Sequence, residues 1–106
     1  MTDPLPQSPY SATLVVHEAI TKLDALDAMA AALKVAIQRP GTSRPFVSVG
    51  EGEWAEIEIP KFGEAPPLSI DVYSVSSRAD AEARALALMG QLATSTGWTI
   101  RPMFAG

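Results

Sequence analysis

The stretch PLSIDVYSVSSRADAEARALALMGQL, residues 67–92, decides how this chain folds. Over residues 68–73 apolar and polar side chains alternate strictly, which predicts a strand with one buried face. After a serine-rich break, apolar residues recur at three- and four-residue steps over residues 81–92, the pattern of an amphipathic helix. Ser77 is the expected N-cap, with Asp80 three residues later. The central unit is therefore a strand that leads directly into a helix.

A hairpin is expected to precede this unit, in residues 45–59. Its strands cover residues 46–49 and 54–59, and the segment Gly50–Glu53 between them has two glycines in four residues, which is strong turn chemistry. The following segment, PKFGEAPP at residues 60–67, is too rich in proline for a continuous strand. We expect it to be a projecting loop.

The first ten residues contain Pro4, Pro6 and Pro9, and suit neither a helix nor a central strand. We expect residues 1–10 to form an extended N-terminal arm. Such an arm is either a frayed terminus or, in an assembly, a contact with a neighbouring subunit.

Residues 12–20, ATLVVHEAI, are compatible with a strand or with the first turns of a longer helix, and we favour a strand. An apolar stripe over residues 23–37 then predicts a helix from Thr21 to Gln38. The sequence Arg-Pro-Gly at residues 39–41 supplies the expected stop.

After the second helix, residues 98–104 predict a last strand, which Pro102 places at a sheet edge. The expected fold is a single α+β domain, with a small, mostly antiparallel or mixed sheet of three to four strands and two helices packed on one face. The spacing from Val16 to Asp24 repeats from Val72 to Asp80, and a true repeat would make a ferredoxin-like sandwich the competing architecture. The expected core comprises Leu26, Leu33, Ile57, Ile70, Val72, Leu88 and Leu92.

Composition excludes several classes of protein. At 106 residues and 47% hydrophobic content the chain suits one compact domain. No segment approaches the ~20 apolar residues of a membrane span, and the N-terminus lacks the pattern of a signal peptide, so we expect a soluble intracellular protein. The absence of cysteine excludes disulfides and thiolate chemistry. A net charge of −4 with eight scattered Lys and Arg residues argues against general nucleic-acid binding.

Candidate catalytic residues are few. His17 is the only histidine, and its neighbours match no motif of nucleophilic catalysis. Glu56, Glu58 and Asp71 converge on one sheet face by alternation, where a solvated acidic surface is the ordinary explanation. The run GEGE at residues 50–53 lacks the Lys and Ser or Thr of a phosphate-binding loop. We expect no enzyme, no metal and no cofactor.

Two pieces of the sequence carry a resemblance to a known family. The first reads PFVSVG, with matching positions Pro45, Phe46, Val47, Val49 and Gly50. The second ends a strand in an aromatic residue and serine before a helix rich in Ala and Glu, with matching positions Tyr73, Ser74, Glu82, Ala83 and Ala85. Over about residues 23–93 the chain resembles the phage tail-completion family, the tail terminators or tail-to-head joining proteins of long-tailed phages. Tyr73 stands where that family usually has Trp, and in that comparison residues 12–20 belong to the first helix.

The resemblance implies a structural protein of the virion, located in the tail or neck and assembled in the host cytoplasm. It implies a homo-oligomeric ring, usually a hexamer, that caps the tail tube and meets a head-completion or stopper protein, with no membrane partner. Such a ring would pair the open strand edges of neighbouring subunits. The candidate subunit contacts are Pro4, Pro6, Pro9, Tyr10, Trp54, Phe62 and Trp98.

DNA would pass through this ring without specific binding. A channel lined by carboxylates repels phosphate, so negative charge suits that passage. The candidate channel-lining residues are Glu51, Glu53, Glu56, Glu58 and Asp71. A rival interpretation is a small acidic binding module, such as a toxin-immunity protein or secretion chaperone, whose acidic face covers a basic target.

Overall fold

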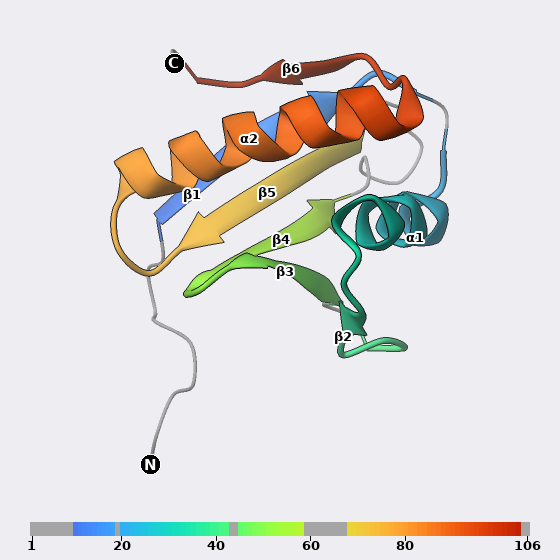
Figure 1. Ribbon diagram of the computed structural model, residues 1–106, viewed down its shortest axis with the longest axis horizontal. Helices are drawn as coiled ribbons and strands as arrows, with labels where there is room; N and C mark the ends of the chain where they lie inside the picture. The colour runs from blue at the N-terminus through green and yellow to red at the C-terminus, as the bar shows by residue number, and fades with distance from the viewer. Residues whose placement is uncertain (1–9, 19, 43–44, 59–67, 105–106) are drawn as a thin grey trace.

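The computed structural model describes residues 10–18, 20–42, 45–58 and 68–104. Along the chain the elements are β1 (Tyr10–Val16), α1 (Lys22–Leu33), β2 (Ile37–Gln38), β3 (Phe46–Gly50), β4 (Glu53–Glu58), β5 (Leu68–Ser74), α2 (Arg78–Thr96) and β6 (Ile100–Pro102). Within the described residues the strands form a six-stranded sheet in the order β2-β3-β4-β5-β1-β6, and every neighbouring pair is antiparallel (Figure 1). The α+β class is confirmed, and the expected count of three to four strands is wrong.

Both helices cover the same face of the sheet (Figure 1). α1 contacts β3 and β4, whereas α2 contacts β1 and β5. The strands β6-β1-β5-β4, taken with the two helices, have the β-α-β-β-α-β connectivity of a ferredoxin-like sandwich, and β3 and β2 extend the sheet beyond β4. The ferredoxin-like sandwich, which the sequence analysis gave as the competing architecture, therefore describes how β1, β4, β5 and β6 are connected.

The N-terminal apolar segment forms a strand, as its β-branched residues favour. β1 pairs along its whole length with β5, from Tyr10 opposite Ser74 to Val16 opposite Leu68. The alternative that residues 12–20 begin a helix is wrong for the described part of that segment, and Tyr10 belongs to the sheet and not to an arm. The rest of the expected arm and the expected loop at residues 60–67 lie outside the described residues.

The first helix begins where expected and ends early. Thr21 caps it, with its Oγ1 accepting from the Asp24 N–H at 3.1 Å. The helix stops at Leu33, because Lys34 takes a left-handed conformation at φ 59° and its N–H bonds back to the last turn. The expected continuation to Gln38 is wrong: Ile37 and Gln38 form β2. Apolar spacing alone did not reveal that the helix ends and a strand follows, since the same side chains suit a short strand as well as a helix.

The second helix agrees with its sequence pattern at both ends. The Ser77 Oγ accepts from the Asp80 N–H at 3.0 Å, and Gly97 ends the helix in the left-handed region at φ 78°. Its buried residues are Ala81, Ala85, Leu88 and Leu92, which lie on one side. This apolar side packs on β1 and β5.

The predicted hairpin is confirmed. β3 and β4 are joined by Glu51 and Gly52, and Gly52 has φ 71°, a left-handed value that glycine adopts without strain. The last strand is also confirmed at an edge, beside β1, although it spans only Ile100–Pro102.

The core lies between the helices and the sheet. All expected core residues are buried except Leu33, which is half-buried because it occupies the last position of α1. Residues that the sequence analysis did not include, among them Leu14, Val16, Met29 and Val47, are fully enclosed as well. Leu14 and Val16 come from β1, which is sandwiched between β5 and β6.

Truncation of a central side chain tests this core. Leu88 is 1% exposed, so Leu88→Ala is expected to lower the free energy of unfolding by about 2–5 kcal/mol. Leu33→Ala should cost clearly less, because its side chain already meets solvent. Urea or thermal unfolding of the two variants measures both effects, and equal losses would contradict the helix faces described above.

Candidate functional site

The side of the sheet opposite the helices, here called the helix-free face, is the largest candidate surface. No helix of the described part of the chain packs on it. It carries the side chains that alternate with those facing the helices, namely Ser11, Thr13, Val15, Gln38, Phe46, Ser48, Trp54, Glu56, Glu58, Ser69, Asp71, Tyr73 and Arg101. Polar groups dominate this set, and three of its members are aromatic.

An aromatic pair occupies one end of the helix-free face. Trp54 on β4 lies directly opposite Tyr73 on β5, and the rings stack with centroids 5.3 Å apart and planes 18° apart. Trp54 is 8% exposed, whereas Tyr73 is half-buried. Trp54 is thus occupied within its own subunit, and little of its ring is left for the neighbour contact that the sequence analysis assigned to it.

A polar row crosses the sheet next to this pair. Glu56 on β4 lies opposite Asp71 on β5, and Asp71 lies opposite Thr13 on β1. The Thr13 hydroxyl donates to Asp71 Oδ1 at 2.7 Å, and the Trp54 indole N–H donates to Glu56 Oε2 at 3.1 Å. Carboxylates on adjacent strands repel each other, and these hydrogen bonds offset part of that cost.

The row corrects one expectation about the acidic residues. Glu56 is only 5% exposed, so the inference that it belongs to a solvated acidic surface is wrong. Asp71 is half-buried, and Glu58 alone of the three is exposed. Glu56 accepts from the indole and lies between Phe46 and Asp71 of the neighbouring strands, contacts that alternation within a single strand does not reveal.

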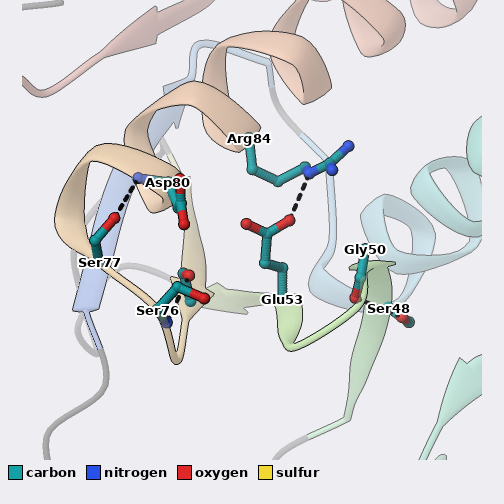
Figure 2. A network of polar contacts seen from close by, with 8 residues as sticks. Ser48, Gly50, Glu53, Ser76, Ser77, Asp80 and Arg84 are labelled. Carbon is teal, nitrogen blue, oxygen red and sulfur yellow. Dashed lines mark hydrogen bonds and ion pairs between the residues drawn. The ribbon is translucent and has the colours of Figure 1, made fainter.

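Glu53 takes part in a different contact, on the helix side of the sheet. Figure 2 shows its carboxylate directed at Arg84 of α2, and Arg84 Nε lies 2.8 Å from Glu53 Oε1. The Glu53 side chain is 13% exposed and the Arg84 side chain 40%, so solvent screens the pair and its contribution to stability is at most about 1 kcal/mol. Glu53 therefore joins the hairpin to α2 and does not belong to an acidic surface with Glu58.

Gly50 makes room for this ion pair. A Cβ atom at position 50 would lie 2.6 Å from Glu53 Oε1 and 3.0 Å from an Arg84 guanidinium nitrogen. The glycine that ends the PFVSVG piece thus leaves space for the carboxylate and the guanidinium, which lie directly over the backbone there.

Ser74, in the second piece that resembles the phage family, stabilises the turn that follows β5. It is fully buried, and its Oγ accepts from the Ser76 N–H at 3.1 Å in the turn between β5 and α2. The next serine, Ser77, caps α2. The serine-rich break is therefore a turn whose backbone donors are bonded by hydroxyl groups.

The remaining candidates are dispersed. Glu51 is exposed at the hairpin tip, at the end of β4 opposite to Glu58. Tyr10 is 47% exposed, and Trp98 is half-buried against the core. The proposed contact residues Pro4, Pro6, Pro9 and Phe62 lie outside the described residues. The structure thus brings Glu56 and Asp71 together and separates Glu51, Glu53 and Glu58.

His17 is exposed beyond the end of β1, and its backbone N–H donates to the Thr99 carbonyl. Among the described residues there is no group of three or more His, Cys, Asp or Glu able to hold a metal ion. No helix within the described ranges is long and apolar enough to cross a bilayer.

One surface feature was missed by the sequence analysis. An open groove of about 380 Å³ lies where α1 meets the end of α2, lined by Ala28, Ala31, Ala32, Lys34, Ser95 and Thr96. The small residues on α1 are the only sequence signal for it, and such residues are equally common where two helices simply approach closely.

Comparison with known proteins identifies no relative. No protein-family model, curated protein or solved structure matches the chain.

Removal of the indole donor tests the polar row. Trp54→Phe keeps an aromatic ring against Tyr73 but deprives Glu56 of a hydrogen bond in a buried position, which is expected to cost about 1–3 kcal/mol. Chemical unfolding measures the loss. Trp98→Phe is the matched control, because it makes the same change in size at a half-buried indole with no carboxylate bonded to it in the described residues. Equal losses in the two variants would mean that only ring size matters.

Proposed function

We propose that this chain is a structural subunit of a phage or phage-like particle, which forms a ring that caps the tail tube and joins it to the head-completion complex. The order of elements carries the proposal. Helix α1, strand β3, strands β4 and β5 and helix α2 follow one another as the resemblance to tail terminators implies for residues 23–93. Two elements depart from it: β1 is a strand where the resemblance implies part of the first helix, and β2 lies between α1 and β3.

The motif residues give the proposal a physical basis. Gly50 leaves space for the pair of Glu53 and Arg84, Ser74 bonds the turn into α2, and Tyr73 stacks on Trp54. Each of these residues takes part in a contact between two elements of the fold. The likeness therefore concerns positions that specify how strands and helices meet, and a shared assembly role is inferred from that.

Ring formation needs two different patches on each subunit that fit each other, because head-to-tail contacts close a ring and self-complementary contacts give dimers. Exposed large apolar residues occur in separate places that suit this need. Leu23 is on α1, Val35 lies between α1 and β2, and Met103 follows β6 at the opposite edge of the sheet. Tyr10 and Val75 lie at the hairpin end.

In this proposal fewer residues are candidates for lining the channel than the sequence led us to expect. Glu58 and Glu51 are the candidate lining residues that are exposed, whereas Glu53 and Glu56 are engaged within the subunit. Channel-lining groups have to meet solvent in order to repel passing phosphate. Glu58 on the helix-free face and Glu51 at the hairpin tip are therefore the positions to examine.

Mass in solution tests the ring. Size-exclusion chromatography with light scattering is expected to give a single species several times heavier than the 11.2 kDa chain. A monomer or an isologous dimer would contradict the ring and favour the acidic binding module. That module would use the same half-buried Asp71 and exposed Glu58 to cover a basic partner.

Charge reversal tests the channel. Glu51→Lys with Glu58→Lys is expected to leave the fold and the ring intact, because both side chains are exposed, and to make the ring retain DNA at low salt. Gel retardation over a salt series measures this gain. The matched control is Glu51→Gln with Glu58→Gln, which removes charge without adding cations. Intact rings with no gain in DNA affinity would place both residues outside the channel.

A further inference from the structure

The open edge of the sheet beside β1 is formed by β6. Pro102 lies opposite Leu14 in this pairing, and the next N–H, that of Met103, donates to the Thr13 carbonyl at 2.9 Å. Successive N–H groups of an antiparallel strand point to opposite edges. Because the Met103 N–H points toward β1, the nitrogen of Pro102 points away from it, toward solvent at the edge.

An incoming strand would need the groups on that outer side. By the same alternation, the backbone N–H of Arg101 points toward β1. The backbone nitrogens within β6 that point outward are those of Ile100 and Pro102. Proline has no N–H, so one of these outward donors is missing and the pyrrolidine ring occupies its place. Proline on an edge strand is a known device against pairing with another chain.

The opposite edge is blunted in another way. β2 is two residues long, and Arg39 directly after it has φ 51°, in the left-handed region, before Pro40. The backbone therefore turns away from the line of the sheet before a long edge can form. Short length and a neighbouring charge are the other devices that proteins use at sheet edges.

The β6 edge has a particular need for such protection. Met103, next to Pro102, is 67% exposed, and an apolar exposed edge favours pairing between copies. We propose that Pro102 is an edge guard: it prevents β6 from pairing with a strand of a second copy and confines self-association to contacts between side chains. This differs from the expectation that a ring would pair the strand edges of neighbouring subunits, and it stands independently of the proposed function.

Restoring the missing donor tests the edge guard. Pro102→Thr introduces an N–H on the outer side and a residue that favours strands. In dilute solution the variant is expected to have the same particle mass as the parent. In concentrated solution its particle mass should be at least twice that of the parent, as measured by light scattering. On association the amide at position 102 should become protected from hydrogen exchange. Met103→Thr is the matched control, because its N–H is already bonded to Thr13, and its mass should follow that of the parent.

Two results would overturn the proposal. The first is a Pro102→Thr protein with the mass of the parent at every concentration. The second is a rise in mass while the amide at position 102 still exchanges freely, which would place the association elsewhere. Circular dichroism checks that the variant is folded. If the threonine variant does not fold, Pro102→Ala restores the same donor with a smaller side chain, and the same two measurements decide.

Discussion

The pairing of β5 on both of its edges is the constraint on which the rest of the structure depends. β5 pairs with β1 along its full length and with β4 on the other side, so its register sets that of the three strands β4, β5 and β1. Leu68, Ile70 and Val72 are 0–2% exposed on the helix side. A shift of one residue would move all three to the helix-free face and bring polar groups into the core. Burial of this alternating set therefore determines the sheet.

Helix α2 is placed by the same strand. The turn after Ser74 leads into the cap at Ser77, and α2 then runs back over β5 and β1 with its apolar side inward. The ion pair of Arg84 with Glu53 joins this helix to the β3–β4 hairpin across the top of Gly50. The turn end of this strand-to-helix unit is thus held by polar contacts, while apolar burial supplies most of the stabilisation.

The acidic residues have separate roles, although they look alike in sequence. Glu53 is paired with a guanidinium, Glu56 is buried and accepts a hydrogen bond from an indole N–H, and Glu58 is exposed to solvent. Alternation correctly put Glu56 and Glu58 on one face. Glu53, which was expected in the hairpin turn, lies on the other face. Alternation did not predict the burial of Glu56, because the pattern within one strand does not reveal contacts with other segments. An acidic surface inferred from spacing alone was for this reason broader than the one that the structure presents.

The sequence by itself determined the strand of residues 68–73, both helix starts, the hairpin and the edge position of the last strand. These features depend on local periodicity, on caps and on turn residues, all of which act within a few positions of the chain. Only the tertiary structure decided the end of α1 at Lys34, the six-stranded order and the enclosure of Leu14 and Val16. The physical reason is that these outcomes depend on contacts between segments far apart in the chain. An apolar residue such as Ile37 satisfies a helix stripe and an edge strand equally well until its neighbours are in place.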